Sequence, residues 1–271
     1  MSTNISKQDS LQLRCYEAIM SQSLHEKCDL TDQLFEDFHQ NKLAIDHQEP
    51  LPINSPGRPA KPELVLPKKL KKRGIASQLG RNHLMHAVAH IEFNAINLAL
   101  DAAYRFADQP IQFYADWLRV AKEEAMHFQM VCEYLNHNDI AYGDFPAHDG
   151  LWDMCVRTDD NVLARMALVP RVLEARGLDV TPSMIEKLIQ ANDNKAAAVL
   201  ERIYQDEIDH VRIGSDWFIY HCQQQKRDPQ STFLDCVEKY LHGELRGPFN
   251  LTARQKAGFT QSELAYLSAN Y

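Results

Sequence analysis

Apolar residues recur every three or four positions over long stretches of the chain, which is the spacing of one face of an α-helix. The four longest stretches are residues 76–106, 111–136, 159–176 and 181–224. Shorter patterns predict one or two helices within residues 11–47, where Leu11, Cys15, Ala18 and Ile19 share a face, and another helix near 231–242. No segment reads convincingly as a β-strand, so the sequence predicts an all-α fold.

Prolines and glycines indicate where these helices end. The segment 108–110 ends in proline and separates the first two long helices. Gly177 is a typical C-cap, and Pro182 follows a capping threonine, so we expect the third long helix to end at Gly177 and the fourth to begin near Pro182. Pro170 should kink the third helix, and a further break near 192–194 stays open.

The remaining segments predict a domain organisation in three parts. Residues 1–75 would hold the N-terminal helices and a proline-rich arm (residues 50–73) that packs on the bundle; the arm ends in a basic run from Lys68 to Arg73. Residues 76–245 would form the bundle, with a long crossover loop at 139–157, and residues 246–271 a polar tail. The basic run is either a solvated segment or a contact for a phosphate-bearing substrate.

Composition excludes some classes of protein. The formal net charge of −8 argues against a general nucleic-acid binder. No stretch of 18 apolar residues is present, so no membrane span is expected. The six cysteines are scattered without a C-x-x-C pair, which favours reduced thiols in a cytoplasmic protein.

Two Glu-x-x-His motifs carry the candidate chemistry: Glu124–His127 and Glu207–His210. Residues three apart share a helix face and can bind one ion. Both motifs lie on apolar stripes, where an unpaired carboxylate would be costly to bury and a metal ion would remove that cost. The apolar members of the two stripes are Phe113, Trp117, Val120 and Val131, and Leu200, Ile203, Val211 and Gly214.

Each motif is preceded by a helix with one glutamate in an apolar setting. The separation from Glu92 to Glu124 is nearly the same as the separation from Glu174 to Glu207. The two halves therefore repeat one ligand layout, which matches the carboxylate-bridged dimetal bundles: one Glu from each of two helices and Glu-x-x-His from each of the other two. The turn at 108–110 suits an antiparallel first hairpin, whereas Pro182 follows Glu174 much more closely, which predicts an asymmetric second hairpin.

The ligand pattern resembles the ferritin-like di-iron carboxylate superfamily. The stretches HAVAHIEFNAINLALDAAYRF, PRVLEARGLDVTP and YQDEIDHV resemble a bacterial ferritin-like family of long-unassigned function, over roughly residues 10–245. Similarity to the tRNA-hydroxylating di-iron monooxygenases is more distant. The resemblance implies a ferritin-like antiparallel four-helix bundle with a long crossover and additional N-terminal helices. Its metal ligands would be Glu92, Glu124, His127, Glu174, Glu207 and His210.

The resemblance further implies an oxidoreductase, a hydroxylase or related monooxygenase, with two iron ions and O2. Manganese is the alternative metal, and the organic substrate is a small molecule, a nucleotide or an RNA. Three other functions stay open: a ferroxidase or other iron-handling protein, a di-manganese peroxide-detoxifying enzyme, and a non-enzymatic RNA- or protein-binding bundle. An electron-transfer partner and a homo-oligomer also stay open.

Two further groups of polar residues have a structural and a functional interpretation. His83, His86 and His90 are either a hydrogen-bonded or solvated patch, or groups that support the metal ligands or touch the substrate. The arginines of the third long helix are either partners in structural salt bridges or contacts for an anionic substrate: Arg165, Arg171 and Arg176.

Overall fold

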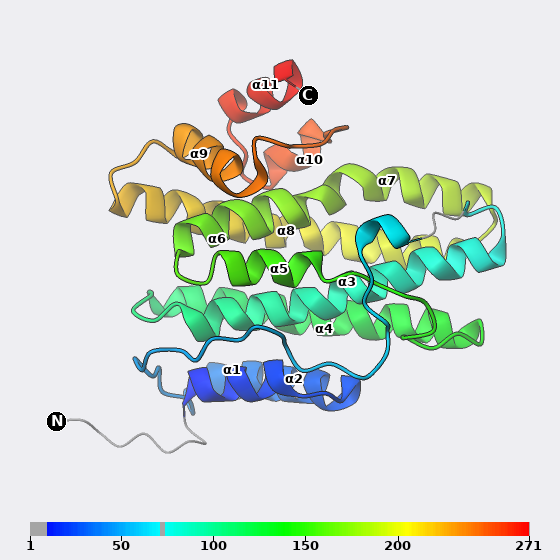
Figure 1. Cartoon of the computed structure of the whole chain (residues 1–271), viewed down its shortest axis with the longest axis horizontal. Coiled ribbons are helices and arrows are strands. Elements are labelled where there is room, and N and C mark those ends of the chain that lie inside the picture. The colour runs from blue at the N-terminus through cyan, green and yellow to red at the C-terminus, as the bar shows by residue number, and fades with distance from the viewer. Residues whose placement is uncertain (1–9, 71–73, 271) are drawn as a thin grey trace. The chain divides into compact units, whose positions relative to one another are not determined.

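The computed structural model describes residues 10–70 and 74–270, and helices dominate them (Figure 1). Within these residues no β-strand forms beyond two isolated bridges. The all-α class predicted from the sequence is confirmed. The chain divides into two compact units, residues 1–152 and 153–271. The three-part organisation with boundaries at 75 and 245 stays a prediction.

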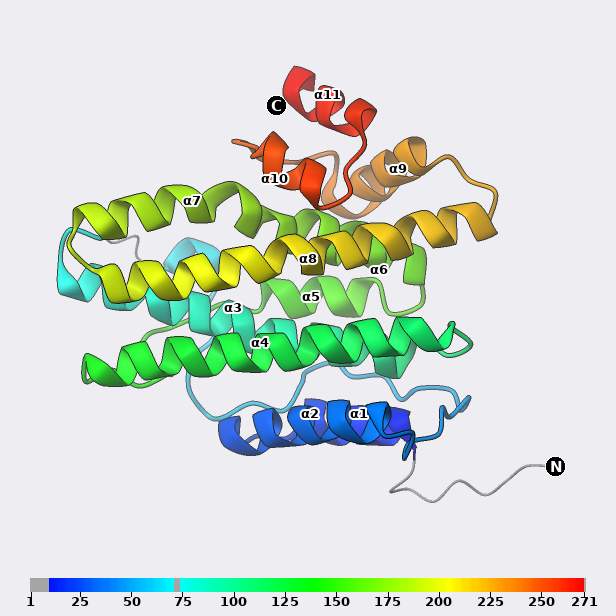
Figure 2. The ribbon, with the colours of Figure 1, turned by 180° about the vertical axis from the view of Figure 1, so that it is seen from behind.

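The first unit is built on a hairpin of two long helices. α3 (Gln78–Arg105) and α4 (Ile111–His137) pack along each other and lie side by side in both views (Figures 1 and 2). Ser77 caps α3 by accepting a hydrogen bond from the Gly80 amide, 3.1 Å away. The predicted helices at 76–106 and 111–136 are confirmed.

A second helical pair covers this hairpin. α1 (Leu11–Met20) packs on α3, and α2 (Leu24–His39) packs on α4. Their amphipathic spacing explains the packing, because the apolar face of α1 predicted from the sequence is fully buried. That face consists of Leu11, Cys15, Ala18 and Ile19.

The proline-rich arm forms no α-helix over its described residues 50–70, because its prolines prevent one. Hydrogen bonds at separate points attach it to the rest of the first unit. The Leu51 amide donates to the Tyr104 hydroxyl at 2.6 Å, and the Val65 amide donates to the Ala147 carbonyl at 2.8 Å. A short 3₁₀ turn, Pro67–Lys69, lies at its basic end. Three members of the basic run lie outside the described residues: Lys71, Lys72 and Arg73.

The second unit is built on another hairpin, whose first half differs from the prediction. This half, the first arm of the second hairpin, consists of α6 (Val162–Leu168), a π-helical turn (Val169–Glu174, the π-turn below) and α7 (Ala175–Gln190). The other half is α8 (Asn194–Gln224), which packs along it. The prediction that a helix ends at Gly177 and another begins near Pro182 is wrong, because α7 continues through both residues.

A side-chain hydrogen bond accounts for this continuation. A proline inside a helix leaves the carbonyl four residues earlier without its usual amide donor. For Pro182 that carbonyl belongs to Leu178, and it accepts a hydrogen bond from the Asn250 side-chain amide at 3.2 Å. The helix survives its proline because a residue 72 positions from Leu178 supplies the missing donor.

The turn of the second hairpin lies at residues 191–193. Asn192 has a left-handed backbone with φ of 57°, and the Asp193 side chain caps α8 by accepting from the Ala196 amide. The break that stayed open near 192–194 is therefore real. The stretch of chain from Glu174 to this turn is about as long as the stretch from Glu92 to the turn at 108–110. The predicted asymmetry of the second hairpin is wrong.

Four further helices complete the described chain. α5 lies in the segment predicted as a crossover loop, α9 confirms the helix predicted near 231–242, and α10 and α11 lie in the segment predicted as a polar tail. No helix in the described ranges is long and apolar enough to cross a membrane. The bounds are Gly150–Arg157 for α5, Pro229–Leu241 for α9, Leu251–Lys256 for α10 and Gln261–Asn270 for α11.

One fully buried lysine joins the N-terminal helices to α3. The ammonium of Lys27 on α2 donates to the carbonyls of Ala18 and Ile19, at 2.8 and 2.6 Å. It also donates to the Asn97 side-chain oxygen on α3 at 2.8 Å. The two carbonyls end α1 and have no amide donor inside the helix, so Lys27 shares them with the amides of Ser21 and Gly57, at 3.4 and 3.0 Å.

Lys27→Met should lower the free energy of unfolding by about 3 kcal/mol, since it leaves three buried acceptors without this donor. Urea unfolding followed by circular dichroism measures this loss. Lys42→Met is the matched control, because Lys42 is exposed and its ion pair with Asp37 should contribute less than about 1 kcal/mol. Equal losses in the two variants would contradict the assigned role of Lys27.

Candidate metal centre

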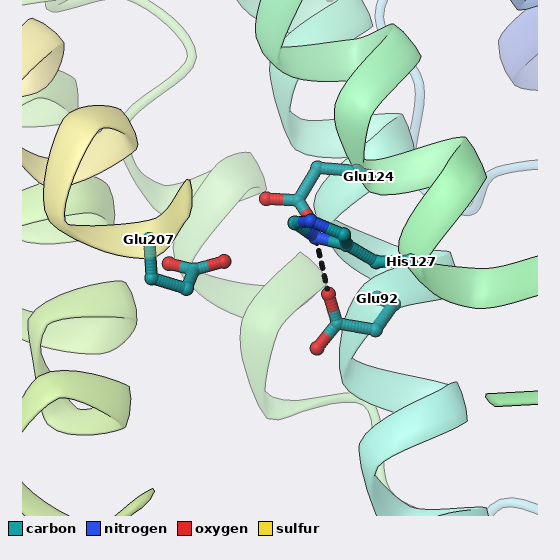
Figure 3. A group of neighbouring side chains, drawn as sticks. All are labelled: Glu92, Glu124, His127 and Glu207. Atoms are coloured by element: carbon teal, nitrogen blue, oxygen red, sulfur yellow. Dashed lines mark hydrogen bonds and ion pairs between the residues drawn. The ribbon is translucent and has the colours of Figure 1, made fainter. Parts of the chain in front are cut away.

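Three predicted ligands meet on the inner face of the α3–α4 hairpin. Glu124 and His127 are three residues apart on α4 and share a face, and Glu92 faces them from α3 (Figure 3). His127 Nδ1 lies 3.3 Å from one oxygen of Glu92 and 3.3 Å from one oxygen of Glu124. One ligand atom from each of the three residues lies within 4.8 Å of the others, so this group can hold a metal ion.

The ionisable side chains of this group are buried, so their charges act strongly on one another. Glu124 and His127 are completely buried, and Glu92 is 4% exposed. Burial by itself would lower the pKa of His127, but the hydrogen bonds and negative charges of Glu124 and Glu92 raise that pKa to about 11. The two carboxylates therefore favour a positive charge between them.

The second Glu-x-x-His motif has the same local geometry on α8. Glu207 Oε1 lies 3.5 Å from His210 Nδ1. The His210 side chain is fully buried, and that of Glu207 is 12% exposed. Figure 3 also draws Glu207, which projects from α8. The apolar stripe predicted around this motif is confirmed, since Leu200, Ile203 and Val211 are buried.

Glu174 is the last residue of the π-turn on the arm that packs along α8. One of its carboxylate oxygens is buried. The structure thus brings Glu92, Glu124 and His127 together and places Glu207 beside His210. The meeting of all six predicted ligands in one centre stays a prediction.

Comparison with known proteins identifies a family. The model of a family described as "Protein of unknown function (DUF455)" matches residues 20–265. The chain belongs to the DUF455 family. A Haemophilus influenzae (strain ATCC 51907 / DSM 11121 / KW20 / Rd) protein described as uncharacterized is 45% identical over 263 residues, covering 92% of this chain and 91% of that protein. No solved structure matches.

The histidines that precede Glu92 in this DUF455 chain make structural hydrogen bonds. His90 Nε2 donates to the His148 carbonyl at 3.0 Å, because a carbonyl only accepts, and Nδ1 then accepts from the Tyr142 hydroxyl at 2.8 Å. His86 Nε2 accepts from the Gly143 amide at 2.8 Å. His83 stacks on an aromatic ring, that of Phe145. The hydrogen-bonded interpretation is confirmed for His86 and His90, which hold the loop after α4 against α3.

The arginines of the third predicted helix also have structural partners. Arg165 is buried and donates to the Thr158 hydroxyl at 2.7 Å and to the Cys155 carbonyl. Arg171 forms an ion pair with Glu263 at 2.6 Å.

Arg176 donates to two backbone carbonyls, those of Arg246 and Pro248, each at 3.0 Å. The salt-bridge interpretation is confirmed for Arg171 and for Arg176, whose guanidinium also lies 3.6 Å from the Asp179 carboxylate. Glu263, the partner of Arg171, lies in the segment predicted as a tail and was not among the candidate residues. The spacing Thr260-x-x-Glu263 is a capping box that predicts a helix start and could have found it.

His86 should make the stability of the fold depend on pH. Burial is the main cause that lowers its pKa, and the charges of nearby His90 and His83 lower it further. The pKa falls to about 4, below the value of about 6.5 in an unfolded chain. The unfolded state therefore binds the proton more readily, and stability is lost as the pH falls from about 6.5 to about 4. We expect about 2 kcal/mol of loss between pH 7 and pH 5 from this residue alone.

The measurement is urea unfolding in a chelating buffer at pH 7 and pH 5. His86→Gln retains an acceptor for the Gly143 amide without titrating, so its stability should fall less on acidification than that of the wild type. His137→Gln is the control, since His137 is exposed. An undiminished pH effect in His86→Gln would exclude His86 as its source.

Proposed function

We propose that this protein is a di-iron oxidoreductase that uses O2 to hydroxylate or mono-oxygenate an organic substrate. Its fold would be a ferritin-like four-helix bundle, formed by the α3–α4 hairpin and the hairpin of the second unit. The metal ligands would be Glu92, Glu124, His127, Glu174, Glu207 and His210.

The observation that carries the proposal is the buried group of Glu92, Glu124 and His127. Burying two carboxylates in a helical core is costly unless a cation compensates them. The three side chains converge on one point, with both carboxylates at 3.3 Å from the same imidazole nitrogen. This convergence is what a metal ion would require of its ligands.

The donor set fits iron or manganese. Carboxylate oxygens and imidazole nitrogens suit these ions, whereas structural zinc sites and iron–sulfur clusters use clustered thiolates. Four glutamates balance the charge of two divalent cations. Glu92, Glu124, Glu174 and Glu207 would hold the ions through carboxylate oxygens, and His127 and His210 would supply one nitrogen each. Six ligands for two ions leave positions for water, O2 or substrate.

The metal pair, when bound, would supply the electrons that reduce O2. The protein holds the ligands on long helices, which fixes their directions better than loops would. Around the α4 motif, Val120, Phe128 and Val131 are buried. These apolar neighbours exclude water from the carboxylates and strengthen their attraction for a cation.

Elements beyond the two hairpins support an enzyme over a storage subunit. α1, α2 and the proline-rich arm are bonded to the first unit, and α9, α10 and α11 are added in the second unit. A minimal iron-storage bundle needs none of them. We propose that this added structure serves an unidentified organic substrate. That substrate is a small molecule, a nucleotide or an RNA.

Glu124→Ala and Glu207→Ala should each abolish the loading of two metal ions, because each removes a proposed carboxylate ligand. Elemental analysis of protein reconstituted with Fe(II) under anaerobic conditions measures the metal per chain. Glu133→Ala and Glu201→Ala are matched controls, since both residues are exposed on the same helices and should leave loading unchanged. Full occupancy in either test variant would contradict the ligand assignment.

O2 consumption should distinguish the proposed reaction class from the alternatives. Iron-loaded protein supplied with a chemical reductant should consume O2 repeatedly, while iron stays at two per chain. Accumulation of many more iron atoms per chain would indicate a ferroxidase or storage protein. O2 release from peroxide by manganese-loaded protein alone would indicate a peroxide-detoxifying enzyme. RNA binding by protein without metal would favour a binding module.

A further inference from the structure

The C-terminal segment (residues 245–270) packs against the helices that carry the proposed ligands of the second unit. α10, α11 and the residues between them contribute apolar side chains to a buried cluster that also includes residues of α7 and α8. From the C-terminal segment the cluster includes Ala253, Ala257, Phe259, Leu264 and Leu267.

The cluster includes or touches the residue that directly follows each proposed ligand of the second unit. Ala175 follows Glu174, Ile208 follows Glu207, and Val211 follows His210; all three belong to the cluster or pack against it. The C-terminal segment therefore lies beside the end of the π-turn and the ligand-bearing turns of α8.

A buried cation links this segment to the π-turn. The Arg171 side chain is fully buried in the middle of the π-turn and donates to Glu263 on α11 at 2.6 Å. Its guanidinium also lies over the rings of Phe218, Phe233 and Phe259, at 4.6, 5.0 and 4.6 Å. Since Phe259 and Glu263 both belong to the C-terminal segment, that segment supplies a charge and a ring to hold this cation.

Glu263 has two roles, one for each oxygen. Its Oε2 accepts from the Thr260 amide at 2.8 Å and completes a capping box at the start of α11. Its Oε1 accepts from Arg171. The start of α11 and the π-turn are therefore held by a single carboxylate.

Pro170, the residue before Arg171, packs against Gly214 of α8. A β-carbon at Gly214 on α8 would lie 2.2 Å from the ring of Pro170, so the ring fills the space that glycine leaves. Because each helical residue turns the chain by about 100°, the extra residue of a π-turn changes the direction of the side chains that follow it. Glu174 ends this π-turn, so its direction depends on the π-turn being kept.

We propose that the C-terminal segment is a clamp that positions Glu174 for metal binding, with Arg171 and Glu263 as its positioning residues. Glu263 holds Arg171, Arg171 holds the π-turn, and the π-turn directs the Glu174 carboxylate. The inference rests on the proposed function, because it needs Glu174 to be a ligand. Outer residues that orient a ligand typically change metal affinity by about 10- to 100-fold.

The test is a titration of the full-length, metal-free protein with Co(II), followed by its visible absorption. Glu263→Gln keeps an oxygen for the α11 cap but removes the charge beside Arg171, and Arg171→Met removes the cation. We expect both variants to bind the weaker of two Co(II) ions at least about tenfold less tightly than wild type, and to shift the absorption bands.

Two controls separate positioning from stability. Lys27→Met lowers stability in the first unit and should leave both Co(II) affinities unchanged. Lys256→Gln removes an exposed charge from the C-terminal segment and should also have no effect. Circular dichroism confirms that each variant is folded. If one variant does not fold, Gly214→Ala takes its place, because its β-carbon would displace the ring of Pro170.

The outcomes distinguish this inference from the proposed function. Wild-type protein that binds two Co(II) ions, together with folded Glu263→Gln and Arg171→Met variants of unchanged affinity, would overturn the clamp alone. Wild-type protein that binds no Co(II) would overturn the proposed function and the clamp with it. Loss of affinity in Lys27→Met to the same degree as in Glu263→Gln would reduce the clamp to a general effect of stability.

Discussion

Two carboxylates buried against one imidazole constrain the first unit. Glu92 and Glu124 reach His127 from two helices in an apolar core, where an uncompensated charge is costly. α3 and α4 must therefore keep one relative register along their length. The N-terminal helices and the loop bonded to His86 and His90 pack on this hairpin, and Lys27 joins α1 and α2 to α3.

The second hairpin, which carries the other proposed ligands, is built from less regular helices. Its first arm contains two prolines and a π-turn, each of which disturbs the backbone hydrogen bonds of a helix. Partners from the C-terminal segment compensate for these disturbances. Asn250 donates to the carbonyl that Pro182 leaves without its helical donor, and Glu263 balances the buried Arg171. A segment that has the composition of a polar tail thus belongs to the structure of the arm that carries Glu174.

The predictions from sequence were strongest where periodicity and local contacts decide the outcome. The helices at 76–106 and 111–136 were predicted within a few residues, because their apolar spacing agrees with the proline-ended segment 108–110 that separates them. The predictions near Gly177 and Pro182 were wrong, since local signals for helix ends were overridden by contacts with segments far along the chain. α10 and α11 were missed because short amphipathic segments show little periodicity.

The sequence by itself determined the helical class, the first hairpin and the residue types of the candidate ligands. These features depend on the spacing of side chains along one helix, which the chain carries in every conformation. Only the tertiary structure decided which arginines are salt-bridged, where the second hairpin turns, and that Glu92 meets Glu124 and His127. Those features depend on distances between segments far apart in the chain, and such distances exist only after the apolar faces have packed.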